Sequence, residues 1–268
     1  MPNARDASIE VHKRILLVGQ TGSGKTTQIW TLPGKKFCYV FDPNALSSLK
    51  GCDVDYEEFL PDVMSMDMSL KGFNKGSKSD RPVKPAEPKI FNAWAEDFNR
   101  KYDIGYFNDY QWLVFDSATF VTKAIMDRQL YINGRYGDVE DIADYKVVGA
   151  KVADIFANIA GMKMNVLMTG HLSTYQDEKT KKIETQLNLP GRARNLLPLQ
   201  FTDVWLAQAS DDSKGGVKYE VRTVPDARGL QTIRCSIPGL LPVEEVTIKD
   251  FKNPTSYGVG KLLGKAKR

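Results

Sequence analysis

The chain has 268 residues, 42% of them hydrophobic, and a formal net charge of +4. A chain of this length and composition can bury a substantial core. The net charge is too small to produce a global basic field that would indicate nucleic-acid binding. Three cysteines without C-x-x-C spacing argue against a disulfide framework and a zinc site. No apolar run approaches the roughly 18 residues of a membrane span, and the opening MPNARDASIE has no hydrophobic signal region, so we expect a cytoplasmic protein.

The first predicted strand leads directly into a glycine-rich segment. Residues 14–18, RILLV, form a short apolar run typical of a buried strand, and residues 19–27 read GQTGSGKTT. A short helix is expected over 26–32, ended by Pro33 and Gly34. Strand, glycine loop and helix in this order are the arrangement that places an anion at a helix N-terminus.

The glycine-rich segment matches the phosphate-binding pattern G-x-x-x-x-G-K-[ST]. Gly19 and Gly24 are its glycines, and Lys25 and Thr26 close it. Glycines let the backbone turn tightly enough for successive N–H groups to point at phosphates, the lysine reaches the outer phosphates, and the threonine hydroxyl binds Mg²⁺. The alternative is a flexible Gly/Ser turn. The residues predicted to bind a nucleotide are Gly19, Gln20, Thr21, Gly22, Ser23, Gly24, Lys25, Thr26 and Thr27.

Short apolar runs alternate with helical patterns along the next part of the chain. This is the layout of an α/β protein with a mostly parallel sheet. A second strand is expected over 36–41 and is followed by Asp42. Residues 70–90 are polar and rich in Lys, Pro and Gly, so we expect a mobile insertion there, followed by a helix over 91–100.

The second chemical landmark is an aspartate at the end of another buried run. Residues 112–115, WLVF, lead into Asp116 and Ser117. In an open α/β sheet, a carboxylate at the carboxyl end of a strand lies where ligands bind and can hold Mg²⁺. The alternative is that Asp116 or Ser117 caps the helix expected over 118–130. With the glycine loop upstream, we predict that Thr26 and Asp116 hold Mg²⁺.

A third landmark is a histidine after the next buried run. An amphipathic helix is expected over 142–162, followed by a strand over 164–169 that ends in Gly170 and His171. A polar side chain at the end of the strand beside Asp116 can contact the γ-phosphate or the attacking water. A lone histidine is often simply packed or solvated, so both roles stay open for His171.

Toward the C-terminus the apolar pattern changes to a period of two residues. Short runs over 204–207, 217–221 and 230–235 are separated by the turn-like segments DDSKGG and PDARG. This pattern predicts antiparallel strands that extend the sheet.

Together, these motifs resemble those of RecA-type ATPases: the glycine loop with its short helix, the strand that ends in Asp42, the VFDS segment and the TGH segment. More narrowly, the chain is similar to compact phage-encoded ATP-binding proteins of the AAA family, which include Sak-type single-strand annealing proteins. The resemblance implies a RecA-like P-loop core that binds ATP and Mg²⁺. It predicts an ATP-binding domain over 1–240 and a C-terminal extension with a basic tail over 241–268.

In that family, ATP lies between neighbouring subunits and the loops after later strands contact single-stranded DNA. The resemblance therefore implies a homo-oligomer that acts on single-stranded DNA in phage recombination or replication, with other proteins of those processes as partners, in the host cytoplasm. Residues 131–140 and 173–194 match the loop positions and combine cations with tyrosines, which suits phosphates and unstacked bases. An ordinary charged hairpin is the alternative for the second segment. The predicted DNA-contacting residues are Arg135, Tyr136, Lys181, Lys182, Arg192 and Arg194.

The resemblance also implies catalytic roles. Lys25 and the Mg²⁺ that Asp116 holds neutralise the charge of the transferred phosphoryl group, and His171 contacts the γ-phosphate or the attacking water. Arg222 or Arg228 would act as an arginine finger toward a neighbouring subunit, although ordinary surface arginines are more common.

One departure from the family concerns the general base. RecA-type enzymes place a glutamate just past the second strand, whereas this chain has Asn44 at that point. An amide cannot accept a proton as a base does. Asp42 can take its place, and Glu57 or Glu58 are further candidates. Slow hydrolysis, with nucleotide binding used as a switch, is therefore an open alternative to an active ATPase.

Two other functions are compatible with a glycine loop of this kind. One is a nucleotide-gated binding module that recruits replication partners with little turnover, which the missing glutamate favours. The other is a small nucleotide kinase, which needs an arginine-rich lid, yet residues 70–90 contain only Arg81. A GTPase is disfavoured because residues 74–77, NKGS, lack the closing aspartate of the guanine-reading pattern N-K-x-D.

Overall fold

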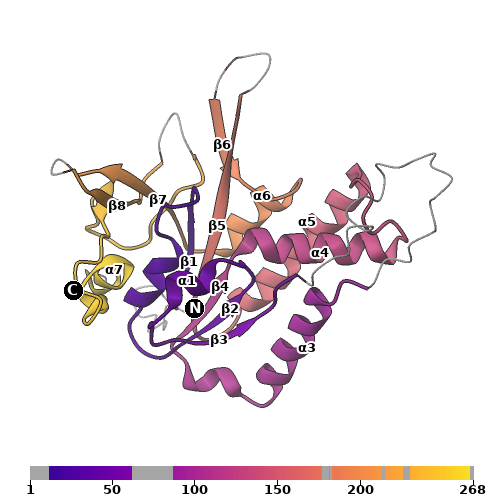
Figure 1. Ribbon diagram of the computed structural model, residues 1–268, viewed down its shortest axis with the longest axis horizontal. Coiled ribbons are helices and arrows are strands. Elements are labelled where there is room, and N and C mark those ends of the chain that lie inside the picture. The colour runs from indigo at the N-terminus through magenta and orange to yellow at the C-terminus, as the bar shows by residue number, and fades with distance from the viewer. Residues whose placement is uncertain are drawn as a thin grey trace, which may run out of the picture.

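Figure 1 shows the protein as a computed structural model in which a central sheet is flanked by helices. The structure describes residues 12–61, 87–176, 181, 183–212, 215–225 and 230–265. Residues 70–86 of the predicted insertion, Lys182 and Arg228 lie outside the described residues. The predicted α/β class, with a mostly parallel sheet and antiparallel strands toward the C-terminus, is confirmed.

The order of the strands places the chemical motifs at one edge of the sheet. The strands are β1 (Arg14–Gly19), β2 (Lys36–Val40), β3 (Asp55–Glu58), β4 (Trp112–Asp116), β5 (Asn165–Gln176), β6 (Ile183–Leu187), β7 (Asp203–Asp211), β8 (Val217–Arg222) and β9 (Val243–Glu245). Their order is β3-β2-β4-β5-β1-β7-β8-β9, with β6 paired to β5. β5 therefore lies between the strand before the glycine loop and the strand that ends in Asp116.

Helices cover both faces of this sheet. The α-helices are α1 (Ala45–Leu49), α3 (Ile90–Asp103), α4 (Ala118–Ile132), α5 (Ile142–Ala160), α6 (Ala193–Leu196) and α7 (Gly258–Lys265). The 3₁₀ helices are η1 (Thr26–Thr31), η2 (Tyr106–Asp109), η3 (Leu197–Gln200) and η4 (Pro254–Ser256). None of the helices in the described part of the chain has the length and apolar character that a membrane crossing requires.

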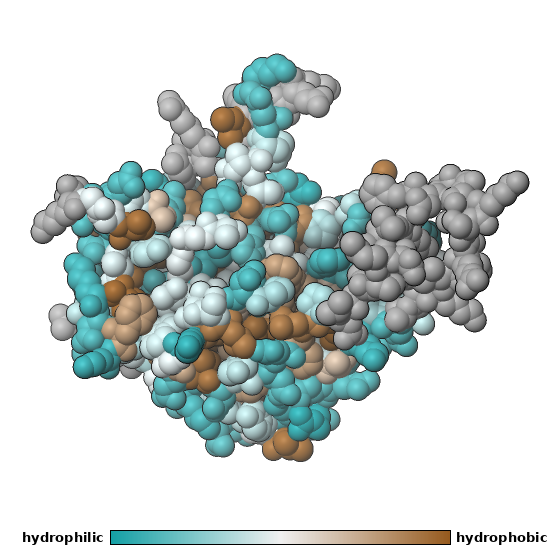
Figure 2. Space-filling view, in the orientation of Figure 1, coloured by the Kyte–Doolittle hydropathy of each residue, from teal (hydrophilic) through white to brown (hydrophobic). Residues whose placement is uncertain are grey.

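The parallel strands are apolar throughout because both of their faces are covered. In β1, Leu16 and Val18 pack with α3, α4 and α5 in one core cluster. Ile15 and Leu17, on the opposite face of the strand, pack with η1, α1 and α7 in the other. The molecular surface is largely hydrophilic on the face shown in Figure 2, where hydrophobic residues gather in the lower middle. The continuous apolar runs of the sequence thus mark strands buried between two layers.

Two strand predictions differ from the structure. The strand predicted to end before His171 continues to Gln176, because its second half pairs with β6 in an antiparallel hairpin that rises from the body of the molecule (Figure 1). The strand predicted over 230–235 is wrong, since Arg234 forms only an isolated bridge to Val204. There the buried Asp203 carboxylate accepts hydrogen bonds from Ser236 N and Oγ, which takes the place of a regular ladder. After β7 and β8, the next antiparallel strand along the chain is β9, which pairs with β8.

The C-terminal residues pack on the helix that follows the glycine loop. The buried Gln28 amide donates to Val246 O at 3.1 Å and accepts from Val259 N at 3.0 Å. The buried Thr31 hydroxyl accepts from Gly260 N at 3.0 Å. A Cβ added to Gly260 would lie 1.8 Å from Thr31 O, so the close contact between α7 and η1 requires a glycine.

The predicted domain boundary at residue 240 stays a prediction. The residues after it supply β9, which pairs with β8, and α7, which packs on η1. Both elements are therefore in contact with the part of the fold that carries the glycine loop.

We predict that Gly260→Ala lowers the free energy of unfolding by about 1–3 kcal/mol, because the added methyl group separates α7 from η1. Urea denaturation monitored by circular dichroism measures this change. Gly264→Ala on the same helix is the control, since no atom lies within 4 Å of a Cβ there. An equal loss of stability in both variants would contradict the steric explanation.

Candidate functional site

A pocket of about 260 Å³ opens at the carboxyl edge of the sheet, between the glycine loop and the start of α1. Larger hollows lie elsewhere on the chain, but this one contains the predicted motifs. Its lining includes Gly24, Lys25, Thr26, Asp42, His171 and Tyr219. The structure thus brings together the glycine loop, the end of β2 and the middle of β5.

Glycines at three positions determine the shape of the loop. A Cβ at Gly19 would lie 2.5 Å from Ala207 O, so there is no space for a side chain. Gly22 and Gly24 have φ values of +81° and +79°, which L-residues rarely adopt. A Cβ at Gly24 would also meet the Tyr219 ring at 2.9 Å. The flexible-turn alternative does not require glycine at each of these positions, whereas this loop does.

Lys25 lies inside the loop and has no acidic hydrogen-bond partner there. Its ammonium donates to Gly19 O at 3.0 Å and to Gln20 O at 2.8 Å. Burial lowers the pKa of Lys25 to about 8, and Asp116 and Asp42 oppose this shift only in part. Two carbonyl dipoles compensate a full charge poorly, so a phosphate group would be a better partner for this ammonium.

Asp116 is buried at the end of β4 between two threonine hydroxyls. Thr26 Oγ1 donates to Asp116 Oδ2 at 2.8 Å, and Thr169 Oγ1 donates to Oδ1. Burial raises the pKa of Asp116, and the two hydroxyl donors counteract this rise. A hydroxyl beside a carboxylate is an all-oxygen donor set of the kind that Mg²⁺ prefers, so these residues fit the predicted metal.

The helix-capping alternative for this segment is not realised. Ser117 occupies the N-cap position of α4, but its side chain makes no capping hydrogen bond. The Asp116 carboxylate points to the two threonines instead. Sequence reasoning missed Thr169, although its position two residues before His171, on the same face of a strand, was an available signal.

His171 and Asp42 lie side by side in the pocket lining. His171 is opposite Gly19 in the register of β1 and β5. Its Nδ1 is 3.4 Å from Ser117 Oγ, and its Nε2 is 3.8 Å from Asp42 Oδ2. Burial, reinforced by the charge of Lys25, lowers the pKa of His171, so the ring is neutral at pH 7. The imidazole is therefore available as a hydrogen-bonding group near the end of the pocket that holds Lys25.

The structure separates the candidates for the missing glutamate. Asp42 lines the pocket, and its Oδ1 accepts from Asn44 N at 2.9 Å. Glu57 forms an ion pair with the buried Lys101, and neither Glu57 nor Glu58 lines the pocket. Asp42 is thus the carboxylate of this group that reaches the site.

Tyr219 was not found from the sequence. It lies on β8, packs over Gly24 and lines the pocket. The period-two pattern predicted its strand. However, β8 comes close to the glycine loop only because β7 pairs with β1 on one side and with β8 on the other, and β1 is far from both in the sequence. Its ring gives the pocket one flat aromatic wall.

Two residues predicted to contact DNA lie near the start of α5. Arg135 forms ion pairs with Asp141, at 3.1 Å, and with the buried Asp144. Tyr136 packs edge-on against Tyr131. The charge of Arg135 is already compensated by two carboxylates, which does not favour a phosphate contact.

The remaining predicted residues are spread over three places. Lys181 is exposed in the connection between β5 and β6. Arg192 and Arg194 line a separate hollow beside α5. Arg222 ends β8, opposite Leu206 of β7. The role of Arg222 as an arginine finger stays a prediction, because it depends on a second subunit.

The fold and the site define a class of protein. A glycine loop between β1 and η1, an aspartate at the end of β4 and an inserted strand β5 form a RecA-like P-loop nucleotide-binding core. A model of the AAA_24 family, described as an AAA domain, matches residues 12–228, and the chain belongs to this family. No curated protein matches the chain.

We predict that ATP affinity falls as the pH rises from about one unit below to about one unit above the pKa of Lys25, near 8. Bound phosphates favour the ammonium and raise its pKa, so binding takes up protons in this range and weakens when the amine is neutral. Calorimetry in buffers of different ionisation enthalpy measures the uptake. Lys25→Arg is the control, since it stays charged and removes the uptake; uptake that persists in it would contradict the assignment.

Proposed function

We propose that the protein is a Mg²⁺-dependent ATPase that acts on single-stranded DNA. Membership of the AAA domain family supports nucleotide binding and ATPase activity. The observation that carries the proposal is the buried Lys25 ammonium, held by carbonyl groups inside a glycine loop and beside the Thr26–Asp116 pair.

Each group in the pocket has a separate role in phosphoryl transfer. The backbone N–H groups of the loop bind the β- and γ-phosphates, and Lys25 leaves its two carbonyl partners to contact them. Thr26 and Asp116 hold Mg²⁺, which supplies charge neutralisation when it is bound. Asp42 accepts the proton of the attacking water, and the neutral ring of His171 donates a hydrogen bond at the γ-phosphate end.

A nucleotide-gated binding module with little turnover is the second candidate. This candidate is supported by two features of Asp42, the proposed base. Its side chain is shorter than that of glutamate, and its carboxylate already accepts a hydrogen bond from Asn44 N. A carboxylate so occupied is a weaker base for a water molecule, so ATP would be held for longer before hydrolysis.

The finer assignments are also proposals. The resemblance to phage-encoded recombination proteins supports a role in phage recombination or replication, with a homo-oligomer that shares ATP between subunits. Cations beside Tyr145 that pair with no acidic group among the described residues support contact with single-stranded DNA. A nucleotide kinase has no comparable support. It needs several arginines around the phosphates, whereas Lys25 and His171 are the basic residues in the lining of the pocket that contains the motifs.

We predict that Lys25→Ala lowers ATP affinity at least about 30-fold, because the variant loses the one buried cation of the pocket lining. Isothermal calorimetry with Mg²⁺ measures the change. Lys249→Ala, which removes an exposed lysine paired with Glu245, is the matched control. Normal ATP binding by Lys25→Ala would contradict the proposed function.

We predict that Asp42→Asn leaves ATP affinity within about threefold of the original but lowers the turnover rate by about 10²–10⁴, as expected for loss of a general base. The asparagine keeps the size and polarity of the side chain, so the loop is undisturbed. Single-turnover hydrolysis measures the chemical step directly. Turnover that is already undetectable in the unaltered protein, with ATP binding intact, would instead select the binding module.

A further inference from the structure

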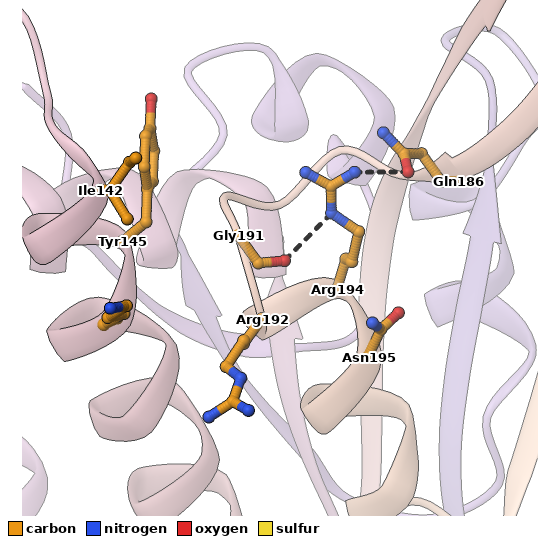
Figure 3. A pocket seen from close by; sticks show the side chains of 8 residues that line it. Ile142, Tyr145, Gln186, Gly191, Arg192, Arg194 and Asn195 are labelled. Carbon is orange, nitrogen blue, oxygen red and sulfur yellow. Dashed lines mark hydrogen bonds between the residues drawn. The ribbon is translucent and has the colours of Figure 1, made fainter. Parts of the chain in front are cut away.

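A second hollow, of about 900 Å³, lies between the first turns of α5 and the segment that enters α6 (Figure 3). A smaller hollow of about 600 Å³ adjoins it and shares Tyr145, Gly191 and Arg194 in its lining. We call the two together the α5–α6 groove. Its side chains include Tyr145, Lys146, Gln186, Arg192, Arg194 and Asn195.

The wall of this groove is held in a defined shape. Gly191 has a φ of +51°, and a Cβ there would lie 2.9 Å from Tyr145 Cβ, so only a glycine lets the chain pass this close to α5. Arg194 Nε donates to Gly191 O at 3.0 Å, and its Nη1 donates to Gln186 Oε1 (Figure 3). These bonds fix the guanidinium at the rim between β6 and α6.

Three cations of the α5–α6 groove, Lys146, Arg192 and Arg194, have no acidic partner in the described part of the chain. Both acceptors of the Arg194 guanidinium are neutral, and the side chains of Lys146 and Arg192 form no hydrogen bond or ion pair with any described residue. Lys123, which lines the smaller hollow, differs because it pairs with Asp127 at 3.0 Å. Three uncompensated charges in a concave surface attract an anion that has several negative groups.

An aromatic ring lines the same hollow as these charges. The Tyr145 side chain extends upward from α5 in Figure 3, with Ile142 beside it and Arg194 across the hollow, whereas Arg192 points downward. Ile142 is 74% exposed, so apolar surface continues along this wall. Glu140 accepts a hydrogen bond from Tyr145 Oη at 3.4 Å and makes the far end of the groove negative. Phosphates are therefore directed to the side of Lys146 and Arg192.

We propose that the α5–α6 groove binds a single strand of nucleic acid, with an unstacked base on the Tyr145 ring and phosphates on Lys146, Arg192 and Arg194. This inference rests on the proposed action on single-stranded DNA and gives it a location. The Tyr145 ring favours a single strand over other ligands of similar charge. An acidic peptide would contact the cations but not the ring, and the bases of a duplex are stacked on each other and are not available to it.

The groove is also joined to the nucleotide pocket by the backbone of His171. His171 O accepts from Asn188 N at 2.9 Å, and His171 N donates to Thr119 Oγ1 at 3.2 Å. Asn188 and Thr119 both line the smaller hollow of the groove. A strand in the groove therefore contacts residues that are one hydrogen bond away from the histidine of the pocket.

Fluorescence anisotropy with a labelled oligothymidine, on the full chain with a non-hydrolysable ATP analogue and Mg²⁺, tests the inference. We expect Tyr145→Ala to weaken binding by about 5- to 100-fold and Tyr145→Phe to restore most of it, because the phenyl ring stacks equally well. Arg192→Ala should reduce the slope of log affinity against log salt by about 0.7, as for one lost phosphate contact. Lys163→Ala, an exposed lysine at the opposite edge of the sheet, should change neither quantity.

Calorimetry of ATP binding on the same variants separates this inference from the proposed function. We expect the groove variants to bind ATP like the unaltered protein. Normal ATP binding together with oligothymidine binding that is unaffected by Tyr145→Ala and Arg192→Ala would overturn the groove and leave the ATPase proposal intact. Polyglutamate that competes as well as the oligonucleotide, with no effect of Tyr145→Ala, would overturn the nucleic-acid assignment.

Discussion

A buried ammonium held by two carbonyl oxygens is the interaction on which the site depends. Lys25 is placed inside the loop because Gly19, Gly22 and Gly24 allow turns that other residues would prevent. Its charge is only partly compensated, and burial lowers its pKa for that reason. A loop that encloses such a charge is preorganised for an anion, which limits the reorganisation needed on binding.

The inserted strand β5 connects this loop to the rest of the chemistry. It pairs with β1 on one side and β4 on the other, so its residues reach both motifs. Thr169 fixes one oxygen of Asp116, and His171 lies between Ser117 and Asp42. Beyond the body of the sheet, the same strand continues into the hairpin with β6, which borders the α5–α6 groove. One strand thus contacts Asp116, carries His171 and borders the proposed site of the nucleic acid.

Much of the core could be predicted from the sequence because its determinants are local. A buried parallel strand is a continuous apolar run, and the glycine loop is a contiguous motif, so β1, β2 and β4 were found close to their observed bounds. The strand prediction that was wrong concerns a segment whose structure depends on residues distant in the sequence. Residues 230–235 have the period of a strand, yet the carboxylate of Asp203 bonds the backbone just beyond them.

The candidate site shows the same division. Lys25, Thr26 and Asp116 follow from motif spacing, and Asp42 from its place after a strand. Tyr219 reaches the site only through the pairing of strands that are far apart in sequence, which no local pattern encodes. Thr169 lies two residues before His171 on β5, so its place followed from the spacing within one strand. Arg135 shows the converse, since its composition and position suggested a DNA contact while Asp141 and Asp144 compensate its charge.

A crystal structure with Mg²⁺ and a non-hydrolysable ATP analogue tests the central claim most directly. The account predicts that Lys25 Nζ leaves the carbonyls of Gly19 and Gln20 for the β- and γ-phosphates, with Mg²⁺ beside the Thr26 hydroxyl and the Asp116 carboxylate. Density for the phosphates outside the glycine loop, or a Lys25 side chain that keeps both carbonyl contacts while nucleotide is bound, would contradict it.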